Sequence, residues 1–124
     1  MASENIFGGK RILLVEDDYF IVMEMVQELE QSGAQVIGPV PSVGKALDRL
    51  ETLSDIHAAI LDINLQGEMV FPVADDLRKR DIPFAFASGY DDTIIPERFH
   101  GVPLLSKFTA VGEIADVLFG IKPN

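Results

Sequence analysis

Short, mostly apolar runs that end at once in polar residues limit most strongly what this chain can fold into. A strand that is apolar along its length must be buried on both faces, which is typical of a parallel sheet covered by helices. Five such runs occur, at residues 11–15, 35–38, 58–61, 83–87 and 102–105. Segments with apolar residues at helical spacing lie between or after them, at residues 18–32, 42–50, 71–80 and 109–119.

This alternation of strand and helix predicts an α/β fold in which right-handed crossovers place helices on both faces of the sheet. The pattern fits a flavodoxin-like (βα)5 doubly wound parallel sheet with strand order 2-1-3-4-5. One unit departs from it, because residues 88–101 contain successive β-branched residues, a central Pro96 and a glycine near each end. These residues disfavour a helix, so we expect a short or irregular fourth helix.

The 124 residues suit one domain with one core. We expect residues 1–9 to form a flexible leader and residues 10–124 to form the domain, with no output domain after the last helix. The chain has no cysteine, which excludes disulfides and thiolate chemistry. Neither a signal peptide nor an apolar run of about 18 residues is present, so the sequence predicts a cytoplasmic protein without a membrane partner.

The charge of the chain is strongly negative, with 20 acidic and 10 basic residues and a formal net charge of −10. Such a surface repels phosphate backbones, so nucleic acid is not expected as a partner. Attraction for cations or for a basic patch on a protein fits the charge better. The alternative is that the excess charge only keeps a small protein in solution.

Three carboxylates follow the first and third predicted strands: Glu16, Asp17 and Asp62. In an open parallel sheet of this order, the ligand site lies at the carboxyl ends of these two neighbouring strands. Three acids in one crevice repel one another and require a raised pKa or a counter-ion. Mg2+ with oxygen ligands meets that requirement.

The fourth and fifth strands bring Ser88 and Lys107 to the same edge. An acidic acceptor, a metal and a cation are the parts needed to move a phosphoryl group. Each residue also has an ordinary reading: Asp17 or Asp18 as a helix cap, Asp62 as a loop residue, Ser88 as part of a turn, and Lys107 as a surface lysine. Their coincidence at one sheet edge favours a site.

Two segments give the chain its resemblance to a known family. Residues 12–18, ILLVEDD, and residues 61–65, LDINL, resemble the acidic pair and the phosphoacceptor segment of the receiver domains of two-component response regulators. The resemblance extends from residue 10 to about residue 120. It implies that Glu16, Asp17 and Asp62 bind Mg2+, that Asn64 adds its backbone carbonyl, and that Asp62 accepts the phosphoryl group.

The same resemblance implies roles for two more residues, with Ser88 at the family's Thr/Ser switch position and Lys107 at its lysine. Residues 83–90, PFAFASGY, resemble the PFxFATGY signature of a subclass, with serine in place of threonine. Members of that subclass are linked to HWE-type or related histidine kinases and often lack a regular fourth helix.

The implied function is that of a single-domain receiver, which takes a phosphoryl group from a sensor histidine kinase or a phosphotransfer protein. Mn2+ or Ca2+ could substitute for Mg2+. The chain would catalyse only its own phosphorylation and dephosphorylation, so it is not expected to be an enzyme for another substrate. It would contact a downstream protein target or act as a phosphate sink, and the sequence does not choose between these.

Two positions depart from the family pattern. Phe108 follows Lys107 where the family usually has proline, often after a cis bond, so the Lys107–Phe108 bond is expected to be trans or strained. Leu104 occupies the usual place of a switching aromatic residue, for which Tyr90 is the candidate replacement. These departures leave open a pseudo-receiver that binds without being phosphorylated. A small aspartyl-phosphate phosphatase fits less well, because Asn64 stands where such enzymes need a second acid.

Overall fold

The computed structural model describes residues 5–87 and 95–121, and five strands in it pair in parallel. The strands are β1 (Arg11–Val15), β2 (Gln35–Val40), β3 (Ala58–Leu61), β6 (Phe84–Ala87) and β7 (Leu104–Leu105). Their spatial order, β2-β1-β3-β6-β7, is the predicted 2-1-3-4-5 of successive βα units. The flavodoxin-like fold is therefore confirmed.

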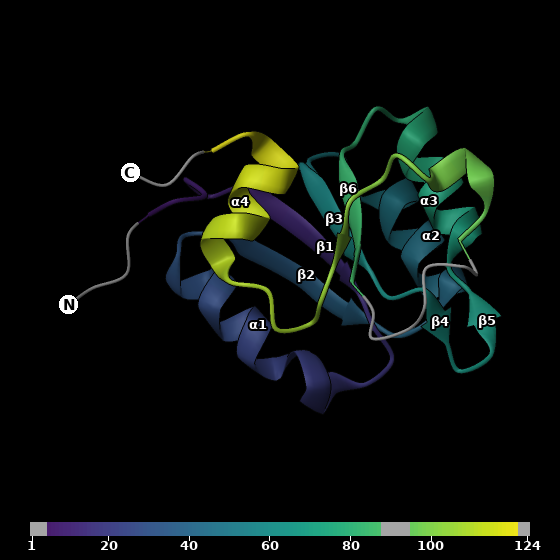
Figure 1. The fold of residues 1–124 in the computed structure, drawn as a ribbon, viewed down its shortest axis with the longest axis horizontal. Helices are drawn as coiled ribbons and strands as arrows, with labels where there is room; N and C mark the ends of the chain where they lie inside the picture. The colour runs from purple at the N-terminus through teal and green to yellow at the C-terminus, as the bar shows by residue number, and fades with distance from the viewer. Residues whose placement is uncertain (1–4, 88–94, 122–124) are drawn as a thin grey trace.

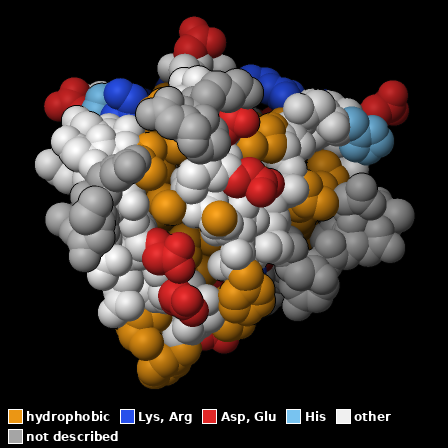
Figure 2. All heavy atoms as spheres, turned by 60° about the vertical axis from the view of Figure 1, so that its left-hand side comes forward, with side chains coloured by type: hydrophobic (Ala, Val, Ile, Leu, Met, Phe, Trp, Pro, Cys, Tyr) orange, Lys and Arg blue, Asp and Glu red, His pale blue; other side chains and the backbone are white. Residues whose placement is uncertain are grey.

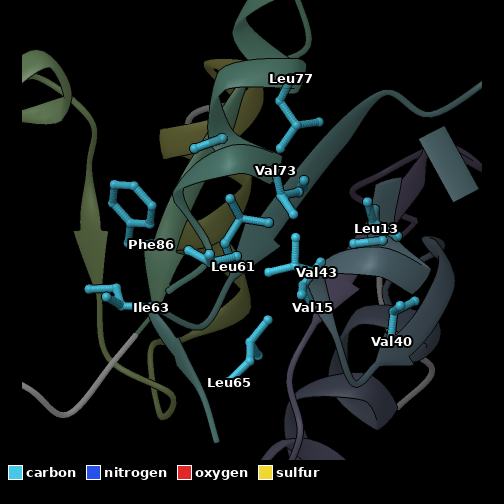
Figure 3. Packing of buried hydrophobic residues seen from close by; sticks show 14 of the residues in the cluster. Leu13, Val15, Val40, Val43, Leu61, Ile63, Leu65, Val73, Leu77 and Phe86 are labelled. Carbon is cyan, nitrogen blue, oxygen red and sulfur yellow. The ribbon is translucent and has the colours of Figure 1, made fainter. Parts of the chain in front are cut away.

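Helices cover both faces of the sheet (Figure 1). They are α1 (Tyr19–Gln31), α2 (Val43–Thr52), α3 (Phe71–Lys79) and α4 (Val111–Phe119). Alternate residues of a strand point to opposite faces, so Leu13 and Val15 pack with α2 and α3 while Ile12 and Leu14 pack with α1 and α4. Figure 3 shows the first of these two cores at close range.

The fourth βα unit contains no α-helix in its described part, residues 95–101, as the sequence predicted. A short 3-10 helix, η2 (Glu97–Phe99), takes its place. Phe99 is buried, with its ring 5.8 Å from that of Phe86, and Arg98 forms a 3.0 Å ion pair with Asp75 of α3. A buried aromatic anchor and a surface ion pair thus hold the segment against α3.

A small hairpin follows β3 where the sequence predicted only a loop through Gly67. It pairs β4 (Asn64–Leu65) with β5 (Glu68–Met69) in antiparallel fashion. The side chain of Leu65 is buried with the core residues that Figure 3 shows, which fixes the hairpin to the domain.

The described part of the expected leader, residues 5–9, packs against the domain. Phe7 is buried, its amide donates to the carbonyl of Ser32 at 3.0 Å, and its ring lies 6.1 Å from that of Phe119. Residues 1–4 lie outside the described part of the chain. Within that part, no helix has both the length and the apolar character needed to cross a bilayer.

We expect Gly38→Ala to destabilise the fold by about 2–3 kcal/mol, because β2 needs a glycine at this position. Gly38 has φ +121°, and an added Cβ would lie 2.5 Å from the carbonyl oxygen of Leu14. Gly44→Ala in α2 is the matched control, since its Cβ meets nothing within 4 Å. Alanine also favours a helix there, so its stability should be unchanged or slightly higher. Urea denaturation measures both, and equal stabilities would contradict the prediction.

Candidate functional site

The register of the sheet places two acids side by side at its carboxyl edge. Val15 at the end of β1 pairs with Leu61 at the end of β3, so Glu16 and Asp62 follow neighbouring strands. The Asp62 amide donates to the carbonyl of Val15 at 2.8 Å. Glu16 and Asp62 are only 2% and 3% exposed, which is unusual for carboxylates and calls for a partner charge.

Asp17 completes a cluster with these two acids. One carboxylate oxygen from each of Glu16, Asp17 and Asp62 lies within 4.8 Å of the others. The neighbouring Asp18 has a different task, because its Oδ1 accepts from the amide of Phe20 at 3.1 Å and caps α1. The cap that the sequence assigned to Asp17 or Asp18 therefore belongs to Asp18.

Lys107 reaches the acids from the loop after β7. Its Nζ lies 2.6 Å from Oε1 of Glu16 and 3.5 Å from Oδ2 of Asp62. Among the described residues the one cis bond precedes Pro39, so Lys107–Phe108 is trans. Where the family has proline, a hydroxyl network shapes this loop: Ser106 Oγ accepts from the Phe108 amide at 3.2 Å and contacts Thr109 Oγ1 at the same distance.

Burial and charge shift the pKa values in this cluster. Burial raises the pKa of Glu16 from 4.5 to about 7, although the hydrogen bond from Lys107 opposes the rise. Burial also raises the pKa of Asp62, again against the effect of Lys107. Burial lowers the pKa of Lys107, but its contacts with Glu16 and Asp62 outweigh this and leave the pKa raised. The lysine is therefore a permanent cation shared by two acids.

The acids line an open cleft of about 260 Å³. Oδ1 of Asp62 is buried and has no hydrogen-bond partner in the described part of the chain. A buried oxygen without a partner is costly, and one lysine does not neutralise three carboxylates. A hard divalent cation such as Mg2+ fits this donor set, since it prefers carboxylate oxygens. Asn64 also lines the cleft, and metal binding by its backbone carbonyl stays a prediction.

Two residues with predicted roles lie outside the part of the chain that the structure describes. Ser88 and Tyr90 lie outside the described residues, so their predicted roles stay predictions. Neither histidine belongs to the cleft lining. His57 Nδ1 accepts from the Arg11 amide at 2.9 Å, and His100 Nε2 contacts the carbonyl of Ile95 at 3.1 Å.

Sequence reasoning placed none of Ile21, Gln66 and Gly67 in the cleft lining. The position of Gln66 follows from the hairpin, whose two-residue turn is Gln66-Gly67. A Gly two residues after Leu65 is a weak turn signal, and the runs on either side are too short to read as strands.

A broader depression of about 340 Å³ lies between α2 and α3. Two of its acids are already paired, Asp76 with Arg80 at 3.2 Å and Asp75 with Arg98 at 3.0 Å. Unlike the acidic cleft, it has no buried carboxylate oxygen without a partner among the described residues.

Raising the pH from 5 to 8 should lower the stability of the metal-free wild type relative to Glu16→Gln. The folded-state pKa of Glu16, about 7, exceeds its ordinary 4.5, so between these values the folded chain binds more protons than the unfolded chain. The contribution of Glu16 to the free energy of unfolding therefore falls across this range, by about 1–2 kcal/mol after allowance for screening. Urea denaturation in EDTA at both pH values measures it, and parallel pH profiles would contradict it.

No family model and no curated protein matches the chain, but solved structures do. SdrG from Sphingomonas melonis Fr1 is 40% identical, with 92% of this chain and 97% of that chain covered and a TM-score of 0.78. The BeF3-activated conformation of SdrG, from Pseudomonas melonis Fr1, is 39% identical, with coverages of 95% and 96% and a TM-score of 0.71.

More distant structures share the fold. A response regulator receiver domain (CheY-like) from Methylobacillus flagellatus is 22% identical, with 92% of this chain and 99% of that chain covered and a TM-score of 0.74. Response regulator TrrA from Thermotoga maritima, solved in complex with Mg2+-BeF, is also 22% identical, with coverages of 86% and 94% and a TM-score of 0.71.

Proposed function

Since the chain belongs to the receiver domains of response regulators, we propose that it accepts a phosphoryl group on Asp62 from a protein donor in two-component signalling. The observation that carries this proposal is the buried Asp62 oxygen without a partner, in a cleft shared with two more acids and a lysine. That combination supplies a nucleophile and a means of balancing the charge it receives.

The three clustered acids, Asn64 and Lys107 each have a part in the proposed transfer. An oxygen of the Asp62 carboxylate attacks phosphorus while the bond between phosphorus and the donor's histidine nitrogen breaks. Glu16, Asp17 and Asp62, with the backbone carbonyl of Asn64, would hold Mg2+, for which Mn2+ or Ca2+ could substitute. When bound, the ion neutralises the charge that develops on the phosphoryl oxygens.

Lys107 would pair with another phosphoryl oxygen, since its Nζ already lies 3.5 Å from Asp62. Ser88 is proposed to donate a hydrogen bond to the same group and so to report phosphorylation to the following segment. The chain would catalyse only its own phosphorylation and dephosphorylation. Tyr90 is the candidate for the aromatic switch that Leu104 does not provide.

Exposed apolar side chains beside the cleft support a protein donor. Phe20 of α1 is 80% exposed and Phe108 is 84% exposed, and Ile21 lines the cleft itself. As the donor we propose a sensor histidine kinase, of the HWE type in keeping with the PFxFATGY-like segment, or a phosphotransfer protein.

The acidic surface supports a protein as the downstream target rather than nucleic acid. On the face in Figure 2, acidic and hydrophobic side chains intermingle, and visible Lys and Arg lie near its upper edge.

The phosphorylated chain would act in the cytoplasm as a messenger to a protein target or as a phosphate sink. A pseudo-receiver, which binds without being phosphorylated, is the alternative that the two departures at Leu104 and Phe108 keep open. A single phosphorylation experiment distinguishes a phosphoacceptor from a pseudo-receiver.

The test is the intact mass of the protein after incubation with acetyl phosphate and Mg2+. We expect a gain of one phosphoryl group that disappears when EDTA replaces the metal. Absence of any gain, both with acetyl phosphate and with a phosphorylated histidine kinase as donor, would overturn the proposal in favour of the pseudo-receiver.

A further inference from the structure

The turn of the β4–β5 hairpin places an unfavourable residue at the mouth of the cleft. Gln66 has φ 54° and Gly67 has φ 94°, so both central residues of the two-residue turn are in the left-handed region. Asn, Asp and Gly are the residues that favour the first of these positions. A glutamine there costs free energy, and such strain at a cleft suggests a function for the side chain.

The hairpin holds Gln66 firmly. The turn is closed by Oδ1 of Asn64, which accepts from the amide of Gly67 at 2.6 Å. On either side of the turn, Leu65 is buried in the core, and the amide of Val70 donates to the carbonyl of Ile63 at 2.9 Å. The backbone of Gln66 is therefore fixed at the rim of the cleft that holds Asp62.

The neutral side-chain amide of Gln66 is available to bind a water molecule in the cleft. The clustered acids of the described lining would hold the metal, Asp18 caps α1, and Lys107 pairs with Glu16 and Asp62. Asn64 has the other carboxamide in that lining, and its oxygen already closes the turn. Gln66 is thus the side chain of the described lining suited to orient a water molecule, because a carboxamide both donates and accepts hydrogen bonds.

We propose that Gln66 positions the water that hydrolyses the phosphoryl group on Asp62, and so sets how long the phosphorylated state lasts. This inference rests on the proposed function. The water oxygen attacks phosphorus, and the bond between phosphorus and the Asp62 oxygen breaks, so that Asp62 leaves as a carboxylate. The proton of the water passes to solvent and inorganic phosphate is released. Gln66 accepts a hydrogen bond from the water and takes no proton.

The test compares Gln66→Gly and Gln66→Ala with the wild type after removal of acetyl phosphate, in excess Mg2+. Intact mass followed over time gives the half-life of the phosphoryl group. We expect both variants to lengthen it by about five- to tenfold, the effect of losing one hydrogen bond, with little change in the rate of phosphorylation. Glu68→Gln, in the same hairpin but outside the cleft lining, is the matched control and should keep the wild-type half-life.

Thermal stability separates this role from a structural one. Glycine relaxes a turn with positive φ and alanine strains it, so the melting temperature should be higher for Gln66→Gly than for Gln66→Ala. Equal half-lives in these two variants, both longer than in the wild type, would assign the effect to the carboxamide. Unchanged or shorter half-lives would overturn the role of Gln66 alone. Failure of the wild type to be phosphorylated by any donor would overturn the proposed function as well.

Discussion

Asp62→Asn is expected to reduce phosphoryl acceptance to background, a loss of at least about a hundredfold in the rate of phosphorylation. The substitution keeps the size of the side chain but replaces the carboxylate oxygen that attacks phosphorus with an amide nitrogen, which is not a nucleophile. Asp62 follows β3 directly and is 3% exposed at the base of the cleft, so no other acid can take its exact place. Intact mass after incubation with acetyl phosphate and Mg2+ measures the effect.

Asp18→Asn is the matched control, because Asp18 lines the same cleft and loses the same charge. Asparagine also caps helices well, so α1 should remain intact. We expect this variant to accept one phosphoryl group at a rate within a few-fold of the wild type. A phosphoryl group gained by Asp62→Asn would identify another acceptor and reject the assignment.

The stability of Asp62→Asn distinguishes lost chemistry from a lost fold. Burial raises the pKa of Asp62, which means that the folded chain holds this carboxylate at a cost in the absence of metal. A neutral amide removes that cost along with the repulsion from Asp17. The metal-free variant should therefore melt at the same temperature as the wild type or higher, although it cannot be phosphorylated.

Most of the fold was predictable because its signals are local. Runs such as 58–61 are apolar throughout, as a strand buried on both faces requires. The segments between these runs have apolar residues at helical spacing, which identifies the connections as helices. The break at Pro96 likewise predicted a unit without a regular helix. The β4–β5 hairpin was not predictable, since two-residue strands carry no periodicity and the turn begins with Gln66 rather than the favoured asparagine.

The site was predictable to the extent that topology alone determines it. Strand order brings the residues after β1 and β3 together, so Glu16 and Asp62 could be placed as neighbours from the sequence. The contact of Lys107 with Glu16 depends on the conformation of its loop, which a hydroxyl network sets in place of a proline. The sequence could name Lys107 but could not choose its partner.

The contact between Lys107 and Glu16 also determines what a metal ion meets. In the metal-free chain Lys107 shares its charge between Glu16 and Asp62, at 2.6 Å and 3.5 Å, while Asp17 has no ion pair in the described part of the chain. Asp17 is therefore the one of the three clustered acids whose charge is not shared with the lysine. Its charge should dominate the affinity for Mg2+.

Asp17→Asn is accordingly expected to weaken Mg2+ binding by roughly 10–100-fold. A charge pair at about 4 Å gives up to about 4 kcal/mol at an effective dielectric constant near 20, and partial exposure of Asp17 reduces this to about 1–3 kcal/mol. Calorimetric titration with MgCl2 at fixed ionic strength measures it, since an acidic protein attracts cations nonspecifically at low salt. Asp18→Asn, with the same change in net charge, should bind within about threefold of the wild type. Equal weakening in both variants would mean that net charge, rather than ligation by Asp17, attracts the ion.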